Sequence, residues 1–139
     1  MNTFFRLFVK GHVRLYKWSG GKRGATLGGM PVILLSSRGR KSGVVRTVPV
    51  VPFRDGDQMY VIASMGGAPK HPAWFLNLEA NPDVEVQVGP ETWRARAEVL
   101  PDNERARVWP RIVAAMPNFG EYQTKTSRVI PVVHLVRAA

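Results

Sequence analysis

The stretch Ser36-Ser37-Arg38-Gly39-Arg40-Lys41-Ser42-Gly43-Val44-Val45-Arg46-Thr47-Val48-Pro49 joins two apolar runs of the chain. It places four cationic side chains around two glycines and three serines. Glycine lets the backbone turn so that successive N–H groups converge, which makes a concave site for anions. Arginine adds forked, charge-assisted donors that suit phosphate or carboxylate. The stretch therefore predicts an anion-binding turn between two strands.

The positive charge of the chain is concentrated in its N-terminal third. The 139 residues carry a net charge of +10, no Asp or Glu precedes Asp55, and eleven of the twenty Lys and Arg lie in the first 54 residues. This asymmetry indicates a polyanionic partner, which could be nucleic acid, an anionic membrane or an acidic cofactor. The length is that of one domain. The absence of cysteine excludes disulfides and thiolate chemistry and suits a cytoplasmic location.

Residues 3–18 are predicted to form a basic amphipathic helix. Aromatic and aliphatic side chains recur at steps of three and four, and Lys and Arg recur on the other face. Such a helix can lie in a membrane interface, on the inner face of the plasma membrane, or it can dock on the protein core. The two alternatives stay open. Neither a secretory signal nor a membrane-spanning helix is expected, because cations interrupt the apolar run.

The remaining chain predicts short strands, two clear hairpins and a few helices. Asp55-Gly56 and Gly89-Pro90 are typical turns between strands, and Pro49 and Pro52 indicate an edge or a bulge. Strands are expected at 32–35, 44–53, 58–64, 84–88, 92–99 and 129–136, and helices at 73–81 and 101–116. Strands and helices do not alternate regularly, so a doubly wound parallel sheet is excluded. The expected fold is mainly β (α+β): a small antiparallel barrel of about six strands with flanking helices.

Several familiar sites are absent from the sequence. A phosphate-binding Gly-x-x-x-x-Gly-Lys-Ser/Thr loop and a Gly-x-Ser-x-Gly elbow do not occur, and the three histidines have no metal-ligand spacing. No metal site is expected. On its own, the cationic turn could be a solvated hairpin or an arm for the minor groove of DNA. Trp18, Trp93 and Trp109 are expected to pack in the core or on the face of the barrel.

The order of motifs beyond the turn decides between these alternatives. Gly39-Arg40-Lys41-Ser42-Gly43-x-x-Arg46-x-x-Pro49 is followed by Ala63-Ser64-x-Gly66-Gly67-x-x-Lys70-x-Pro72-x-Trp74-x-x-Asn77-Leu78-x-Ala80-Asn81-Pro82. Glu121-Tyr122-Gln123 and Ile130-Pro131-Val132-Val133 come later in the chain. This series resembles the deazaflavin-dependent nitroreductase family, which comprises split β-barrel flavin and deazaflavin oxidoreductases of mycobacteria and relatives. The resemblance covers residues 28–136. It implies a split antiparallel β-barrel, similar to FMN-binding split barrels, at 28–139, preceded by the helix and glycine-rich connection at 1–27.

The resemblance implies coenzyme F420, an 8-hydroxy-5-deazaflavin with a phosphodiester and an oligoglutamate tail, as cofactor. Arg40, Lys41 and Arg46 would hold the phosphate with help from Ser42 and the backbone of residues 39–43, and Lys70 would lie toward the acidic tail. The backbone at Ser64, Gly66 and Gly67 would approach the ring. The implied cofactor-binding set is Gly39, Arg40, Lys41, Ser42, Arg46, Pro49, Ser64, Gly66, Gly67, Lys70, Trp74 and Asn77.

The implied reaction is hydride transfer from the reduced ring to a hydrophobic acceptor. By resemblance, Ser64 and Tyr122 are the catalytic hydroxyls, and Met116, Phe119 and Tyr122 line the substrate side. Nitroimidazole-reducing relatives have tyrosines where this chain has Met116 and Phe119, so the acceptor side is more apolar here. A quinone is expected as the natural acceptor, which fits a basic amphipathic N-terminus that meets a lipid-soluble quinone at the membrane, and nitroaromatics are expected as promiscuous acceptors. A second reading is an FMN-binding or non-catalytic F420-binding barrel, and a third is a nucleic-acid-binding module. The first reading expects no nucleic acid partner, and a dimer is compatible with it.

Overall fold

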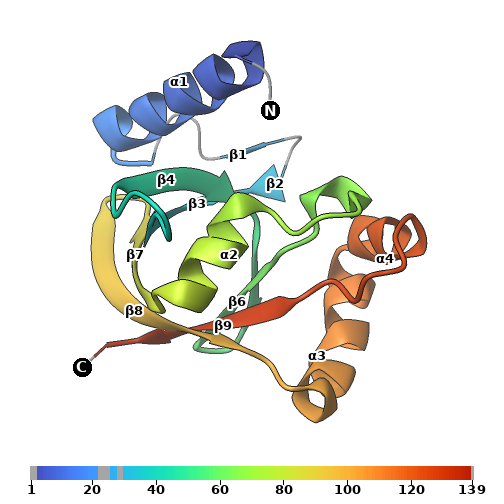
Figure 1. Cartoon of the computed structure of the whole chain (residues 1–139). Coiled ribbons are helices and arrows are strands. Elements are labelled where there is room, and N and C mark those ends of the chain that lie inside the picture. The colour runs from blue at the N-terminus through green and yellow to red at the C-terminus, as the bar shows by residue number, and fades with distance from the viewer. Residues whose placement is uncertain (1–2, 22–25, 28–29, 139) are drawn as a thin grey trace.

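The structure, a computed structural model, describes residues 3–21, 26–27 and 30–138, with the backbone alone at 3–8, 18 and 26–27. A seven-stranded antiparallel sheet, ordered β4-β3-β7-β8-β9-β6-β5, curls into a half-barrel (Figure 1). A separate two-stranded sheet joins β1 (Thr26–Leu27) and β2 (Met30–Pro31). The seven strands are β3 (Ile33–Arg38), β4 (Val45–Val50), β5 (Pro52–Asp55), β6 (Gln58–Ile62), β7 (Asp83–Val88), β8 (Glu91–Val99) and β9 (Val132–Arg137). The predicted split-barrel fold class is confirmed.

The prediction of one strand over 44–53 is wrong. The chain leaves the sheet at Val51, and the two halves, β4 and β5, form the opposite edges of the sheet. Pro49 and Pro52 explain the break, because neither can donate a ladder hydrogen bond and proline is confined to edge strands. The predicted hairpin at Asp55-Gly56 is confirmed, since β5 pairs with β6 and Asp55 lies opposite Gln58. The second predicted hairpin pairs β7 with β8.

In the described part of the chain, four α-helices and one short 3₁₀ turn surround the sheet (Figure 1). They are α1 (Thr3–Ser19), η1 (Met65–Gly67), α2 (Ala73–Ala80), α3 (Asp102–Ala115) and α4 (Pro117–Thr124). In Figure 1, α2 lies in front of the curled sheet, α3 and α4 lie at its right side, and α1 lies above β4. The predicted helices at 3–18, 73–81 and 101–116 are confirmed, and Pro110 lies inside α3.

The buried side chains of the described residues form three clusters, of which the third lies under α1. The barrel interior is centred on Leu35, Val61, Val86 and Val133, which are fully buried. A second cluster lies under α3 and α4 and includes Ile112, Phe119 and Ile130. Trp93 packs against the first cluster and Trp109 against the second, as predicted, while the side chain of Trp18 lies outside the described residues.

The described half of α1 docks on the barrel. Val13 and Tyr16 are buried against Val32 and Leu34. The Tyr16 hydroxyl accepts a 2.8 Å hydrogen bond from the N–H of Gly89, which fastens the helix to the tip of the β7–β8 hairpin. This contact favours core docking for the second half of the helix. The phenylalanines at positions 4, 5 and 8 lie outside the described side chains. No described helix is long and apolar enough to cross a membrane.

Candidate functional site

The turn between β3 and β4 is closed by its own backbone. The N–H of Gly39 donates to the carbonyl of Val44 over 2.8 Å, and the N–H of Gly43 donates to the carbonyl of Gly39 over 2.9 Å. The Ser42 hydroxyl accepts from the N–H of Val44 over 3.1 Å. Gly43 has a φ of 73°, a conformation that side-chain-bearing residues rarely adopt. Ser42 and both glycines therefore shape the turn itself, whatever they bind.

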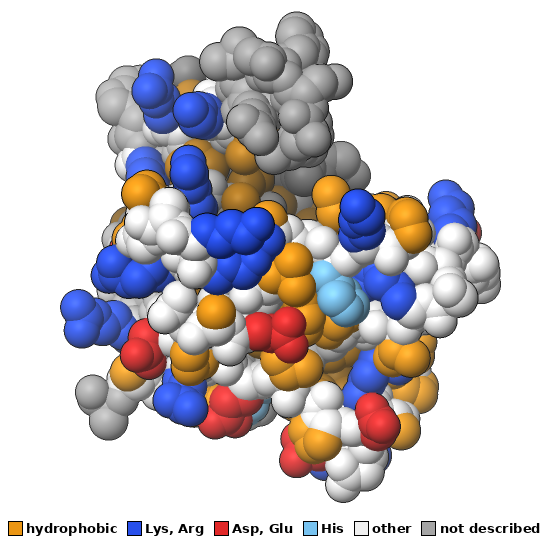
Figure 2. Space-filling model, viewed as in Figure 1, with side chains coloured by type: hydrophobic (Ala, Val, Ile, Leu, Met, Phe, Trp, Pro, Cys, Tyr) orange, Lys and Arg blue, Asp and Glu red, His pale blue; other side chains and the backbone are white. Residues whose placement is uncertain are grey.

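The cations of this turn and of the strand ends beside it are exposed residues: Arg38 in β3, Arg40, Lys41, and Arg46 in β4. Two of them also donate to the protein from Nη1, Arg38 to the carbonyl of Gly43 and Arg40 to Oδ1 of Asn77. Figure 2 shows Lys and Arg side chains gathered at the upper left, over β4 and the turn before it, while Asp and Glu lie lower on this face. Within the described part of the chain, the one ion pair joins Arg111 to Asp55, which ends β5 at the edge of the sheet opposite β4. The positive charge of the turn is thus not neutralised by an acidic neighbour.

A buried asparagine fastens the turn to α2. The Oδ1 atom of Asn77, whose residue is 6% exposed, accepts from the backbone N–H of Arg40 over 3.1 Å and from its Nη1 over 2.8 Å. A hydrogen bond from a guanidinium is stronger than one between neutral groups. Two residues that the sequence placed 37 positions apart in one cofactor site are therefore in direct contact.

The other predicted cofactor residues lie on the neighbouring elements. Trp74 is half-buried and lies three positions before Asn77, so the two share one face of α2. Pro49 is half-buried in β4, opposite Leu34. Lys70 is exposed between η1 and α2. The structure thus joins Arg40 with Asn77 by contact and leaves Lys70 as an exposed cation at the entrance to α2.

The loop after β6 has an unusual backbone. Ser64 lies in the right-handed helical region, with φ −80° and ψ −39°, and the next three residues have φ values of 46°, 65° and 85°. Met65 is the one non-glycine residue with positive φ in the described chain, and its side chain is 56% exposed. Such a residue stores about 1–3 kcal/mol of strain. A right-handed residue followed by a left-handed one turns successive N–H groups toward a common side, which suits an anion or a carbonyl oxygen.

Gly66 and Gly67, both predicted to approach a ring, have different surroundings. A Cβ at Gly67 would lie 2.7 Å from the carbonyl oxygen of Tyr122 and 2.9 Å from the Cβ of Lys125. A Cβ at Gly66 would meet open space. Gly67 therefore allows the loop to pack on α4, and Gly66 remains the exposed glycine. The contact also brings the loop of Ser64 against the helix of Tyr122, the two predicted catalytic residues.

The predicted substrate residues differ in exposure. Phe119 is only 5% exposed and packs edge-on against the ring of Tyr122, with 5.8 Å between centroids. Tyr122 and Met116 are half-buried. The Nζ of Lys125 lies 5.8 Å from the centroid of the Tyr122 ring. Phe119 thus supports Tyr122 from the core, and Tyr122 and Met116 are the members of the set that retain exposed surface.

Arg128 was missed by the sequence reasoning. Its Nε donates to the carbonyl of Ala68 over 2.9 Å, its Nη1 to that of Ala63 over 3.1 Å, and its Nη2 to that of Ser64 over 2.8 Å. Its Nη1 also lies 3.0 Å from Nδ1 of His71. Burial lowers the pKa of Arg128 from its ordinary value. A lone arginine between a helix and a strand carries no motif, so nothing in the sequence marked it.

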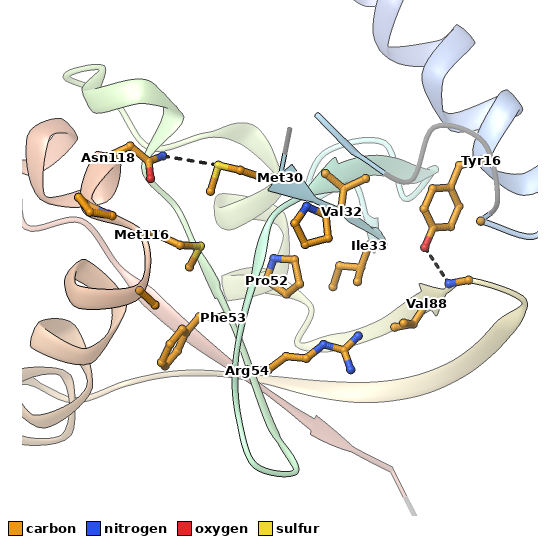
Figure 3. A pocket seen from close by; sticks show the side chains of 15 residues that line it. Tyr16, Met30, Val32, Ile33, Pro52, Phe53, Arg54, Val88, Met116 and Asn118 are labelled. Atoms are coloured by element: carbon orange, nitrogen blue, oxygen red, sulfur yellow. Dashed lines mark hydrogen bonds between the residues drawn. The ribbon is translucent and has the colours of Figure 1, made fainter. Parts of the chain in front are cut away.

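A cavity of about 800 Å³ lies elsewhere (Figure 3). Its wall includes Tyr16 of α1, Met30, Phe53 of β5 and Met116, the last being the one predicted site residue among those that line it. In Figure 3 these side chains come from separate elements and border one apolar space. None of the predicted cofactor residues lines this cavity. The predicted cofactor residues lie instead on the β3–β4 turn, β4, α2 and the segment from Ser64 to Lys70.

Comparison with known proteins identifies the family. The sequence model of the family described as F420H(2)-dependent quinone reductase matches residues 8–137. The F420H(2)-dependent quinone reductase Rv1261c of Mycobacterium tuberculosis is 41% identical over 130 residues, covering 91% of this chain and 87% of that protein. A solved F420-H2 dependent reductase (FDR-A) is 42% identical and superposes with a TM-score of 0.68, covering 76% of this chain and 93% of its own. A second solved structure, described as a domain-swapped dimer, is 35% identical with a TM-score of 0.71 and covers 96% of this chain and 99% of its own.

The fold and these matches define an oxidoreductase of the split-barrel type that depends on coenzyme F420. The chain belongs to the F420H(2)-dependent quinone reductase family. The predicted deazaflavin dependence and cofactor are confirmed. The family description names quinones and does not mention nitro compounds.

The residues present fit this cofactor. A phosphodiester and a carboxylate tail require cations and N–H donors, and the turn offers four Lys and Arg side chains without an acidic neighbour among the described residues. A flat ring requires apolar walls with a few polar contacts. Trp74, Pro49 and the backbone of the Ser64 loop are of that chemistry. The chemistry of these residues therefore agrees with a site for F420.

Proposed function

We propose that this protein transfers a hydride from reduced F420 to a quinone. The observation that carries the proposal is the cationic turn, which has no acidic partner in the described chain and is fastened by Arg40 and Asn77 to the helix that also presents Trp74. F420, when bound, supplies the hydride. The task of the chain is then to hold the cofactor and to orient an acceptor over its ring.

The binding roles follow from charge and exposure. Arg40, Lys41 and Arg46 bind the phosphate, because they are exposed cations on the turn and on the start of β4 that follows it. Lys70 attracts the acidic tail from the entrance to α2. Trp74 and Pro49 border the ring, and the backbone around Ser64 and Gly66 contacts its polar edge. The backbone of Gly39, Ser42 and Gly43 supports the phosphate site by shaping the turn.

Tyr122 is the better of the two proposed proton donors. The acceptor gains a hydride and needs a proton from a group that can touch it. Ser64 is 7% exposed, whereas Tyr122 is half-buried with its ring held edge-on by Phe119. Tyr122 therefore donates to, or binds, the oxygen of the acceptor. We expect Tyr122→Phe to lower turnover more than Ser64→Ala does, measured with saturating cofactor.

The decisive experiment mixes purified protein with reduced F420 and menadione and follows oxidation of the deazaflavin. Binding at micromolar cofactor together with turnover is expected. No binding and no oxidation would refute the proposal. Nitroaromatic acceptors in the same assay test the promiscuous activity, which the apolar Met116 and Phe119 predict to be weaker than quinone reduction.

Removing the cations should weaken binding of the cofactor. We expect Arg40→Ala and Lys41→Ala each to cost about 1–3 kcal/mol of F420 binding, because each removes a charge-assisted hydrogen bond. Fluorescence titration of F420 measures this loss. Arg111→Ala is the control, since Arg111 forms an exposed ion pair with Asp55 and lies outside the proposed site. Equal losses in all three variants would point to general electrostatics instead of a phosphate site.

The competing cofactor and partner readings have separate tests. Tighter binding of FMN than of F420 in a competition titration would favour the FMN-binding alternative. Binding of duplex DNA that weakens steeply with added salt would favour a nucleic-acid module. The relative described as a domain-swapped dimer makes a dimer of this chain a reasonable proposal, which light scattering after gel filtration tests.

The basic face of α1 supports a proposal of peripheral contact with an anionic membrane at the inner face of the plasma membrane. Lys10, Arg14 and Lys17 are exposed, while Val13 and Tyr16 are already used for docking on the barrel. The contact is thus electrostatic on the described side chains. Flotation with vesicles containing phosphatidylglycerol should carry the protein upward at low salt, and neutral vesicles should not. Flotation that is the same with anionic and neutral vesicles and does not change with salt would contradict an electrostatic contact.

A further inference from the structure

Arg128 binds the backbone on both sides of the strained residue Met65. Before it, the carbonyls of Ala63 and Ser64 accept from Arg128, and after it the carbonyl of Ala68 does so. A guanidinium has only donors, so Nδ1 of His71 must accept in the fourth contact, and the proton of that imidazole lies on Nε2. Four of the five N–H donors of Arg128 are used on this one loop.

These contacts set the direction of two peptide units. In a trans peptide the C=O and the following N–H point in opposite directions. The carbonyls of Ala63 and Ser64 point toward Arg128, so the N–H groups of Ser64 and Met65 point away from it. Ser64 has right-handed helical angles, which keep successive peptide units nearly parallel. The loop therefore presents two neighbouring N–H donors on the side opposite to Arg128.

The positive charge of Arg128 makes the N–H groups of Ser64 and Met65 stronger hydrogen-bond donors. No described acidic side chain forms an ion pair with Arg128, so its charge acts on the peptide units that it contacts. Hydrogen bonds in a chain polarise one another, and a cation on the carbonyl end makes the N–H end a better donor. The pair thus has the character of a site for a carbonyl oxygen or an anionic oxygen.

Arg128 is itself held firmly. The Nε2 of Gln123 donates to the carbonyl of Arg128 over 2.7 Å, and Oε1 of Gln123 accepts from the N–H of Ile130 over 3.0 Å and from Nη2 of Arg105 over 3.1 Å. Gln123 lies one residue after Tyr122 on α4. Arg128 is therefore anchored to the helix that packs on the loop through Gly67.

We infer that Arg128 is a positioning residue that orients the N–H groups of Ser64 and Met65 to bind an oxygen on the polar edge of the cofactor ring. The inference rests on the proposed function for the identity of the ligand. The orientation of the loop rests on the contacts of Arg128 alone.

Two substitutions and a matched control test this role. Arg128→Lys keeps the charge but cannot reach four acceptors, and Arg128→Ala removes both charge and donors. Arg111→Lys is the control, because Arg111 also uses two guanidinium nitrogens, in its case on Asp55. We expect F420 to bind about tenfold to a hundredfold more weakly in both Arg128 variants and unchanged in Arg111→Lys, because the two N–H donors lose their alignment with the ligand oxygen.

A second readout needs no cofactor. Hydrogen exchange of the amides of residues 63–71 should speed up in both Arg128 variants while the amides of β7 and β8 keep their protection. Guanidinium ion at millimolar concentration should restore part of the F420 affinity of Arg128→Ala, and urea at the same concentration should not. Unchanged loop exchange in a folded Arg128→Lys variant, or rescue by urea as well, would overturn the inference.

The contact between Arg128 and His71 gives a further test, in which a smaller effect is expected. His71→Asn keeps an acceptor near the position of Nδ1, and His71→Ala removes it. The alanine variant should show the faster loop exchange of the two, with an effect below that of Arg128→Lys. If wild-type protein failed to bind F420 while the Arg128 variants still loosened the loop, the proposed function would fall and the positioning role would stand.

Discussion

The two halves of the proposed cofactor site are held together in opposite ways. The β3–β4 turn closes on itself, through bonds among Gly39, Ser42, Gly43 and Val44. The loop at 63–71 is held by Arg128, which lies 57 to 65 positions away in the chain. The backbone of the turn is closed within one hairpin and only Arg40 is tied to a distant residue, Asn77, whereas the loop depends on the folding of the whole barrel. We therefore expect the loop to be the more fragile of the two.

This difference also separates how tightly the cofactor is bound from how it is oriented. The turn supplies exposed charges, whose effect falls off slowly with distance and tolerates small displacements. The loop supplies directed N–H groups, whose effect depends on angle. Damage to the turn should weaken binding, whereas damage to the loop should misplace the cofactor relative to Tyr122.

The largest expected effect comes from Gly67→Ala in the loop compared with Gly39→Ala in the turn. At Gly67 the added Cβ meets the backbone of α4 at 2.7 Å, and its φ of 85° is strained for alanine. At Gly39 the nearest atom, at 2.8 Å, is the movable hydroxyl of Ser42. We expect a loss of about 2–4 kcal/mol in the free energy of unfolding for Gly67→Ala and about 1 kcal/mol for Gly39→Ala.

Urea denaturation of both variants measures this contrast. Gly66→Ala serves as the control within the loop, because it shares a positive φ but adds a Cβ in open space. It should cost about 1 kcal/mol. Equal losses at Gly66 and Gly67 would mean that backbone strain, and not packing on α4, determines the effect.

The next largest effect is expected from Asn77→Ala, which disconnects the turn from α2. It removes the acceptor for two donors of Arg40 and leaves a hole in a buried site. We expect about 1–3 kcal/mol of lost stability, with weaker F420 binding in titration. Asn77→Asp retains the acceptor oxygens and should preserve more of the stability. If the alanine variant bound F420 as tightly as wild type, Arg40 would not need Asn77 for its position.

The smallest effect is a gain, expected from Ser37→Ala in β3. The Ser37 hydroxyl is buried and has no hydrogen-bond partner within the described structure. A buried unsatisfied polar group is costly, so its removal should raise the free energy of unfolding by about 1 kcal/mol. Thermal melts with and without F420 measure it. If Ser37→Ala raised the stability of the free protein but lowered that of the protein with F420, the cofactor would use this hydroxyl. Ser36→Ala, which breaks a 2.8 Å hydrogen bond to Thr47, is the control.

Much of the fold could be predicted because its signals are local. The turns at Asp55-Gly56 and Gly89-Pro90 and the periodicity of the helices depend on neighbouring residues. Pro49 and Pro52 marked an edge or a bulge within 44–53, but the placement of the two halves at opposite edges of the sheet could not be predicted, since it depends on their partner strands. Only the pairing of β4 with β3 and of β5 with β6 separates them.

The sequence by itself determined the cationic turn, because its cations and glycines lie within one hairpin and its closing hydrogen bonds join neighbouring residues. It also indicated F420, through the order of its motifs. Only the tertiary structure decided that Asn77 would hold Arg40, that Gly67 would face α4 and that Arg128 would orient the Ser64 loop. The physical reason is that directed hydrogen bonds between distant segments exist only after the barrel has closed and brought their donors and acceptors within reach.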